Sequence, residues 1–474
     1  MAGTFNTRER TGAHRGPMHS PDRTSPTLSG RVLRPGDPGY DARRAGFNIV
    51  VEHRPAAIVE AHGPADVVAA VRLATGEGRP VAVMATGHGP SVPADGAVLV
   101  RTDRLDGVAI DPVRGTARVG AGARWRSVVA AASRHGLAPL NGSSPAVGVA
   151  GYTLGGGIGL LGRRYGFAAD HVRRIDIVTA DGRLRRVTAD SDDDLFWALR
   201  GAGSNFGVAT ELEIDLFPVT ELLGGELCFG PEASADVLDA YADWAAAAPE
   251  TMASSVLLLA YPDVPEVPPE LRGRHVTHVR IADSAPDHRD GLARVAALRA
   301  IAPRLVDTVR LMPYAQVGTI HHEPVDIPVP AFDRNILLDR FDAPAAAVVS
   351  AHAGPEAGGG FLVELRAWGG ALARPASPPN AVGGRDAAFS LLAISDPDPD
   401  TRTRRDGLLA AMAPWASGGT YLNFAGVEDT APADVRRGYR PEDWHRLRRL
   451  KATYDPDATF RVNFTIPPAE RSPR

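Results

Sequence analysis

The sequence is poor in cysteine, in lysine and in long apolar runs. Among its 474 residues, Cys228 is the only cysteine and Lys451 the only lysine. A single cysteine excludes an intramolecular disulfide and a cluster of thiolate metal ligands, and it fits a cytoplasmic protein. No apolar stretch has the length and composition of a membrane-spanning helix. We therefore expect no bound metal and no membrane partner.

A strong excess of charge is also missing. The formal net charge is −4, with 23% charged and 44% hydrophobic residues, which is ordinary for a globular protein. These values do not indicate a nucleic-acid partner. Residues 1–30 are polar and arginine-rich and lack the apolar core of a secretion signal, so we predict a disordered N-terminal extension.

The first part of the folded chain alternates short strands with helices. A strand at 57–60 precedes a helix at 65–75, in which apolar residues recur at helical spacing, and a second strand at 81–84. This order is typical of a βαβ unit. The small-residue loop after the second strand is a usual place for phosphate-binding turns, although its His88 could equally be a surface imidazole. Further predicted elements are strands at 97–101, 108–111, 116–119, 176–179, 184–187 and 208–216, and helices at 124–134 and 193–199.

After Pro218 the pattern changes to longer strands that alternate with helices. This pattern predicts a second α+β unit built on an antiparallel sheet. Its clearest elements are strands at 256–260 and 276–281 and helices at 233–244 and 291–302. Near the end of the chain we predict a helix at 441–453, and we expect its basic run at 446–451 to be the solvated face.

Two polar groups in this second unit could carry chemistry. The run 361–368 (FLVELRAW) is predicted to be a strand with Glu364 and Arg366 on one face. That face is either solvated or the ceiling of a polar pocket, where both side chains could reach one ligand. The run 321–323 (HHE) with Asp326 could suggest a metal site, but adjacent histidines point to opposite sides of a strand, so we expect a solvated loop.

A glycine-rich stretch is the most unusual part of the chain. Residues 146–162 carry no charge, and seven of these seventeen are glycine. Glycine lets another group approach the backbone closely, and exposed N–H groups suit a phosphate or a ring oxygen. The run GGGIG at 155–159 could also be only a flexible turn. A nicotinamide dehydrogenase is disfavoured because no clear strand precedes this run and no acidic residue ends a second strand about 20 positions later.

Four motifs occur in order along the chain: ATGHG (85–89), PAVGVAGYTLGGGIG (145–159), DLFWALRGAGSNFGV (194–208), and YLNF (421–424) followed by YDPDATFRVNF (454–464). Together they resemble the berberine-bridge-enzyme-like branch of the vanillyl-alcohol-oxidase flavoprotein superfamily. The similarity covers residues 54–219 and 418–467 and is weaker between them.

The resemblance implies an α+β fold with two domains. Residues 31–218 and 418–474 would form a two-part FAD-binding domain of the vanillyl-alcohol-oxidase type. Residues 219–417 would form an inserted α+β substrate-binding domain whose antiparallel sheet roofs the flavin ring.

The resemblance also implies FAD as the cofactor, bonded covalently through His88 to the flavin 8α-methyl group. The backbone of the 85–91 loop and of the glycine run would line the pyrophosphate, and Asn463 would lie beside the ring. The implied cofactor-binding residues are Ala85, Thr86, Gly87, His88, Gly89, Ser91, Ser143, Ser144, Val147, Gly148, Gly151, Gly155, Gly156, Gly157, Val208 and Asn463.

Two positions refine this expectation. Relatives with two covalent flavin bonds carry a cysteine at the position of Ser144, and a hydroxyl cannot replace the thiolate in that bond. At most one covalent bond is therefore expected. Val147 matches a position where the family's oxidases tend to have valine and its dehydrogenases leucine, which favours O2 as electron acceptor.

The implied reaction is hydride transfer to flavin N5 from a small organic substrate such as a sugar, an alcohol or a natural product. Tyr421 matches the family's active-site tyrosine, which acts as a base or a hydrogen-bond partner, although it could also be a core residue. Tyrosine has a pKa near 10, so a base at neutral pH needs a cationic neighbour. Our candidate is Arg366, held by Glu364. The alternative of another class is a flavin-binding protein without turnover, acting as a scaffold or a binding module.

Overall fold

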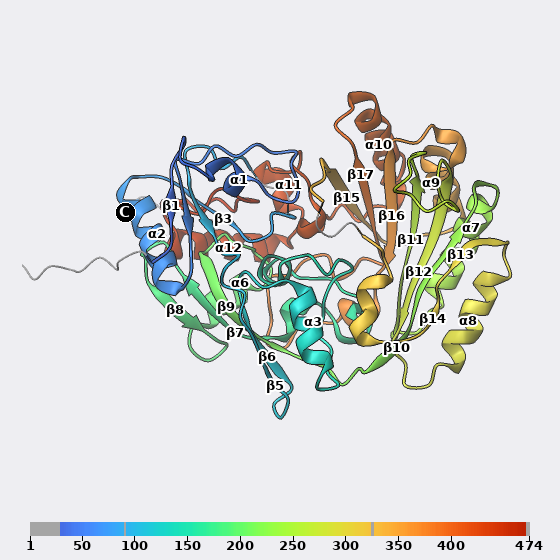
Figure 1. The fold of residues 1–474 in the computed structure, drawn as a ribbon, viewed down its shortest axis with the longest axis horizontal. Coiled ribbons are helices and arrows are strands. Elements are labelled where there is room, and N and C mark those ends of the chain that lie inside the picture. Colours follow the sequence, from blue (N-terminus) through green and yellow to red (C-terminus); the bar gives the residue numbers. More distant parts are fainter. Residues whose placement is uncertain (1–28, 90–91, 324–326, 471–474) are drawn as a thin grey trace, which may run out of the picture.

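The computed structural model describes residues 29–89, 92–323 and 327–470. The predicted N-terminal extension lies almost entirely outside these ranges, as do Ser91 and Asp326. Within them, helices surround three sheets of four, five and eight strands, which confirms the α+β fold class (Figure 1). None of the helices in these ranges combines the length and apolar character of a membrane span.

The four-stranded sheet contains the predicted βαβ unit. Strands β2, β4 and β3 are parallel, and helix α2 connects β2 to β3. Pro64 begins this helix, where a missing N–H costs no helical hydrogen bond. Val67 and Val71 on α2 are fully buried against the sheet. In spatial order the strands are β1 (Val32–Leu33), β2 (Ala57–Glu60), β4 (Val98–Arg101) and β3 (Val81–Met84), with α1 (Tyr40–Arg44) and α2 (Pro64–Gly76).

The five-stranded sheet is antiparallel and shares one apolar core with several helices. Trp125 on α3, Phe196 on α6 and Trp444 on α12 all belong to this core, so the last helix of the chain completes packing that begins near residue 117. The strands are β5 (Val108–Asp111), β6 (Thr116–Gly120), β9 (Val208–Asp215), β7 (Val172–Val178) and β8 (Leu184–Val187), and these three helices are α3 (Trp125–Ser133), α6 (Asp193–Leu199) and α12 (Pro441–Tyr454).

The eight-stranded sheet is antiparallel, and four helices cover one of its faces (Figure 1). Seven strands follow the order β13 (Arg304–Asp307), β10 (Glu221–Phe229), β12 (His275–Asp283), β11 (Met252–Ala260), β16 (Phe361–Ala367), β17 (Phe389–Ser395) and β15 (Phe332–Leu338), and β14 (Arg310–Pro313) pairs with β10. The covering helices are α7 (Ser234–Ala246), α8 (Arg289–Arg299), α9 (Ala343–Ala353) and α10 (Pro399–Ala411).

Strand β16 shows how this sheet separates its two faces. Val363 and Leu365 pack into the helix-covered core, whereas Leu362, Glu364 and Arg366 line a cavity on the opposite face. The predicted strand is confirmed, and of the two alternatives for its polar face the pocket ceiling is correct. The period-two alternation of a strand is the physical reason.

The C-terminal helix contains an unexpected buried charge. The sequence pattern favoured a solvated basic run at 446–451, but Lys451 is 0% exposed. Its Nζ donates to the carbonyl oxygens of Asn205 (2.5 Å) and Phe460 (2.9 Å) and to Oδ2 of Asp455 (2.7 Å). The prediction of a solvated side chain is therefore wrong for Lys451, which links the C-terminal tail to the 201–207 turn by hydrogen bonds.

We expect Lys451→Met to lower the free energy of unfolding by roughly 3–5 kcal/mol, because it leaves the Asp455 carboxylate buried without its counter-ion. Urea unfolding measures this loss. Arg449→Met on the exposed side of the same helix is the control and should change stability by less than about 0.5 kcal/mol. Equal effects of the two substitutions would contradict the role given to Lys451.

Candidate functional site

A cavity of about 1040 Å³ is lined on one side by the polar face of the eight-stranded sheet and on the other by loops of the two smaller sheets. Its volume is at the upper end of the roughly 300–1,000 Å³ typical of small-molecule sites. The cavity brings together most of the predicted cofactor residues: Ala85, Thr86, Gly87, His88, Gly89, Ser143, Ser144, Val147, Gly148, Gly151, Gly155 and Asn463.

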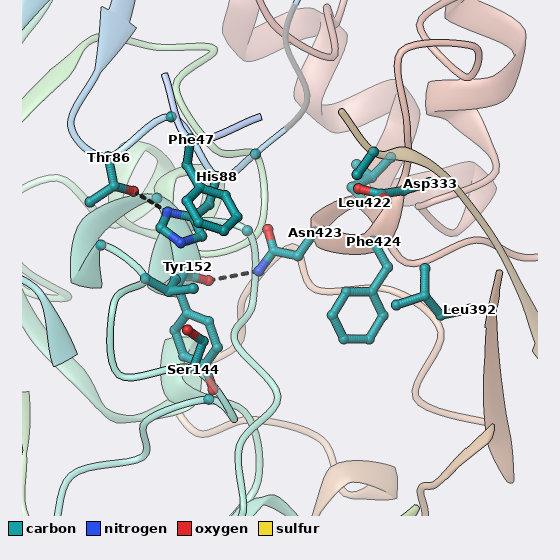
Figure 2. Close-up of a pocket in the computed structure, with 18 of the residues that line it drawn as sticks. Phe47, Thr86, His88, Ser144, Tyr152, Asp333, Leu392, Leu422, Asn423 and Phe424 are labelled. Atoms are coloured by element: carbon teal, nitrogen blue, oxygen red, sulfur yellow. Dashed lines mark hydrogen bonds between the residues drawn. The ribbon is translucent and has the colours of Figure 1, made fainter. Parts of the chain in front are cut away.

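His88 lies in the loop that follows β3, at the cavity wall (Figure 2). Its ring stacks on Phe47 with centroids 3.9 Å apart, and its Nδ1 lies 2.9 Å from Oγ1 of Thr86. Gly87 has a φ of 72°, and a Cβ there would collide with the backbone of Gly46. Glycine is therefore required for the close backbone approach that places Phe47 against the imidazole.

The roof of the cavity carries four alternating charges on three strands. Glu226 on β10 lies 3.5 Å from Arg280 on β12, whose Nη1 lies 3.7 Å from Oε1 of Glu364 on β16. Oε2 of Glu364 accepts a hydrogen bond from Arg366 at 3.0 Å, and Ser255 donates to Oε1 at 2.7 Å. We call these four charged side chains the charge ladder.

The charge ladder keeps its carboxylates ionised. Burial alone would raise the pKa of Glu364, but the positive charges of Arg366 and Arg280 help to lower it to about 2. For Glu226, burial is likewise outweighed, chiefly by the hydrogen bond from His278, and the pKa falls to about 2. Each carboxylate therefore has its compensating partners within the protein, and neither is a good proton acceptor at neutral pH.

A buried group behind Glu226 has the residue types of a metal site. The Nδ1 atom of His278 lies 3.0 Å from Oε2 of Glu226 and 3.3 Å from Sγ of Cys228. Burial raises the pKa of the Cys228 thiol, so it stays protonated, and Arg280 already supplies positive charge beside Glu226. These contacts favour a hydrogen-bonded support for the charge ladder over a metal centre.

His321 corrects the expectation of a solvated loop at 321–323. Its side chain is buried, 4% of its residue surface is exposed, and it lines the cavity, with Nδ1 3.9 Å from Oε1 of Glu364. Burial, followed by Arg280, holds the pKa of His321 well below its usual value, so the imidazole is neutral. His322 beside it has a φ of 48°, in the left-handed region that few non-glycine residues adopt.

Tyr421 lines the cavity and is buried. Its hydroxyl oxygen accepts hydrogen bonds from the N–H of Gly157 (2.8 Å) and from Nδ2 of Asn423 (3.2 Å). Burial raises the pKa of Tyr421, and Arg366, which is paired with Glu364, lowers it only weakly. The expectation that Arg366 would make this tyrosine a base at neutral pH is therefore not supported.

Comparison with known proteins assigns this geometry to a family. The FAD binding domain family matches residues 55–188. (R)-6-hydroxynicotine oxidase from Paenarthrobacter nicotinovorans is 31% identical over 95% of this chain and 99% of its own length. The chain belongs to the FAD-linked oxidoreductases of the vanillyl-alcohol-oxidase type.

A solved structure and one further relative support the assignment of this flavoenzyme. The crystal structure of 6-hydroxy-D-nicotine oxidase from Arthrobacter nicotinovorans superposes with a TM-score of 0.80 at 25% identity, covering 94% of this chain and all of that one. A carbohydrate oxidase from Microdochium nivale is 31% identical over 46% of this chain and 49% of its own length. The predicted family and the prediction of an FAD-linked oxidoreductase are confirmed.

The cavity of the flavoenzyme fits FAD. Gly151 and Gly203 both line it, and a Cβ built on either residue would meet no protein atom within 4 Å. Bare backbone therefore faces open space at two places, as close contact with a large flat or phosphate-bearing ligand requires. Asn463 lines the same cavity, and its Nδ2 donates to Oγ of Ser204 at 3.2 Å.

The structure corrects three of the predicted cofactor residues. Gly156 and Gly157 do not line the cavity; a Cβ on Gly156 would contact the Tyr421 ring, and the Gly157 amide is used by the Tyr421 hydroxyl. These glycines make room for protein side chains, not for the pyrophosphate. Val208 is buried with Val178 and Phe460, because alternate residues of β9 point to opposite faces.

Sequence reasoning missed several residues that line the cavity. Asn423 donates from Nδ2 to the carbonyl oxygen of Tyr152 (2.8 Å) and to the Tyr421 hydroxyl, and only its place in the YLNF motif could have indicated it. Arg280 and Asp333 lie on strands that carry no recognisable motif. Their positions depend on which strands become neighbours.

We expect Tyr421→Phe to lower the free energy of unfolding by about 1–3 kcal/mol, because the buried Gly157 amide loses its acceptor. Chemical denaturation of the flavin-loaded protein measures the change. Tyr261→Phe is the control, since that hydroxyl makes only a long contact of 3.3 Å to His278. An unchanged stability of the Tyr421 variant would contradict the hydrogen bond as described.

Proposed function

We propose that the protein is a flavin-dependent oxidase that removes a hydride and a proton from a small organic substrate and passes both electrons to O2, releasing hydrogen peroxide. The observation that carries the proposal is one continuous cavity, which extends from His88 to the charge ladder. It offers room for a cofactor against the glycine backbone and for a substrate under the polar roof. The oxidases among the relatives and Val147 at the cavity wall support O2 as acceptor.

Bound FAD would supply the hydride acceptor. His88 is the proposed point of covalent attachment, since its ring is fixed at the cavity wall by Phe47 and Thr86. Ser144 also lines the cavity, but it has no thiol for a second bond.

The protein side chains would orient the substrate. With its pKa raised, Tyr421 keeps its proton and can donate a hydrogen bond into the cavity, while Gly157 and Asn423 fix the direction of its oxygen. Glu364 and Arg366 would contact polar groups of the substrate from the roof. Such positioning can remove a large part of the activation free energy. A substrate bound close to the hydride acceptor has already lost its translational freedom before the reaction.

Anaerobic mixing with a panel of amines, alcohols and sugars tests the proposal. We expect at least one class to bleach the flavin absorbance band, and air to restore the band with release of one peroxide per flavin reduced. A protein that binds flavin but is bleached by none of the panel would be the binding module without turnover. If the flavin is bleached but its reoxidation in air releases no peroxide, the protein is a dehydrogenase and not an oxidase.

For His88 we expect a covalent bond to the flavin. Acid precipitation of the wild-type protein should leave the yellow colour in the pellet, and His88→Ala should release it to the supernatant. His135→Ala, which changes an exposed histidine, is the control and should keep the colour in the pellet. Colour in the wild-type supernatant would show that the bond does not form.

A further inference from the structure

Asp333 is a carboxylic acid in an apolar part of the cavity wall. It lies on β15, where Ile394 of β17 is its direct partner, and Leu362 of β16 pairs with Ile394 in the same row. Leu422 and Phe424 line the same cavity. In Figure 2, Asp333 and Phe424 are on the opposite side of the view from His88.

The side chain of Asp333 has no polar partner in the described part of the chain. Its Oδ1 is buried and accepts no hydrogen bond. The cation that acts on its pKa is Arg405 of α10, which is fully buried and already paired with carboxylates. Arg405 donates to the carbonyl oxygen of Phe332 (3.0 Å), to Asp406 (2.8 Å) and to Glu428 (2.5 Å).

The other charged groups on the surrounding elements are either paired with an opposite charge or exposed to solvent. Arg334 on the same strand binds Asp406 (3.3 Å) and Asp429 (3.2 Å). Glu364 on β16 belongs to the charge ladder, and Asp396 after β17 is exposed. Asp333 is thus left without a counter-ion, although every buried cation near it has at least one carboxylate.

This isolation changes the protonation of the acid. Burial raises the pKa of Asp333 to about 7, against a smaller opposite effect of Arg405. At neutral pH the group is therefore divided between a neutral acid and an unpaired anion. A cation placed beside it would favour the anion and recover a charge-assisted hydrogen bond.

We propose that Asp333 is a specificity-determining residue that binds a protonated amine of the substrate, so that the cavity selects organic ammonium ions with an apolar carbon skeleton. The proposal rests on the proposed function for the presence of a substrate in this cavity. The charge ladder is neutral as a set. Of the other acidic residues that line the cavity, Asp396 is exposed and Glu323 lies 3.8 Å from His321, whereas the ionised Asp333 is a buried negative charge that a cationic ligand would compensate. The apolar side chains of Leu362, Ile394 and Leu422 would contact the carbon skeleton of the bound ammonium ion.

Binding of matched amines and alcohols to the flavin-loaded protein tests this selectivity. Calorimetric titration with 2-phenylethylamine and cyclohexylamine, against 2-phenylethanol and cyclohexanol, gives Kd values without hydride transfer when the flavin has first been reduced with dithionite under anaerobic conditions. We expect the amines to bind about tenfold more tightly at pH 8 than at pH 6, because a group with a pKa of about 7 ionises over that interval, and the alcohols to show no such change.

Asp333→Asn should remove the pH dependence and weaken amine binding at pH 8 to the level of the alcohols. Asp400→Asn, which removes an exposed carboxylate of α10 that does not line the cavity, is the matched control and should leave the difference between amines and alcohols intact. Equal affinity for amines and alcohols, absence of amine binding, or a pH dependence that persists in Asp333→Asn would each overturn the proposal.

Stability gives a second readout that needs no ligand. The pKa of Asp333 is higher in the folded than in the unfolded chain, so its stabilising contribution is complete below pH 4 and is lost as the pH rises through 7. The Tm of Asp333→Asn should therefore rise relative to the wild type between pH 4 and pH 8. A constant difference would overturn the proposal by showing that the carboxyl has a partner.

The two proposals can fail separately. Amine binding through Asp333, with no compound of the whole panel bleaching the flavin, would leave the cation site intact and refute the oxidase. Bleaching by uncharged substrates, with no amine binding, would leave the oxidase intact and refute the cation site.

Discussion

The charge ladder is the constraint on which the rest of the cavity depends. Four ionised side chains in a largely buried roof are tolerated only because each lies against an opposite charge. The strand register provides this arrangement: Glu226 is the direct partner of Arg280, and Ser255 pairs with both Arg280 and Arg366. A slip of one residue would turn these charges into the apolar core under the helices.

The opposite wall of the cavity depends on contacts between distant parts of the chain. The Tyr421 hydroxyl joins the C-terminal segment to the glycine run through Gly157, and Lys451 joins the last helix to the 201–207 turn. Asn335 of β15 accepts from the backbone N–H of Tyr421 (2.8 Å) and donates to its carbonyl oxygen (3.1 Å). The same tyrosine is therefore held by the eight-stranded sheet and by the loop that would face the cofactor.

Local patterns predicted the parts of the site that local forces determine. The faces of β16 follow from period-two alternation, the motifs around His88 and Tyr421 indicated the family, and twelve of the sixteen predicted cofactor residues line the cavity. The glycine run was located correctly, but sequence alone could not show that Gly156 and Gly157 accommodate protein side chains. Val208 belongs to one of the four motifs, but the alternation of residues along β9 places its side chain in the apolar core and not at the cavity.

The remaining errors concern partners that are far apart in sequence. In the sequence, His321 belongs to a short polar run. It lies beside Glu364 only because of the way the strands assemble into the sheet. Asp333 reads as an ordinary strand residue, and its isolation arises because Arg405 and Arg334 are occupied by carboxylates at positions 406–429. Likewise, Lys451 belongs to a run of basic residues, yet carbonyl groups from two other segments surround it.

A double-mutant cycle on Glu364→Leu and Arg366→Met, followed by chemical denaturation, tests most directly whether the charge ladder is one coupled unit. Each single change should destabilise the protein strongly by stranding a charge, and the double change should cost less than the sum, with a coupling free energy of about 0.5–3 kcal/mol. Additive effects within about 0.5 kcal/mol would contradict the account, because the roof charges would then be independent of one another.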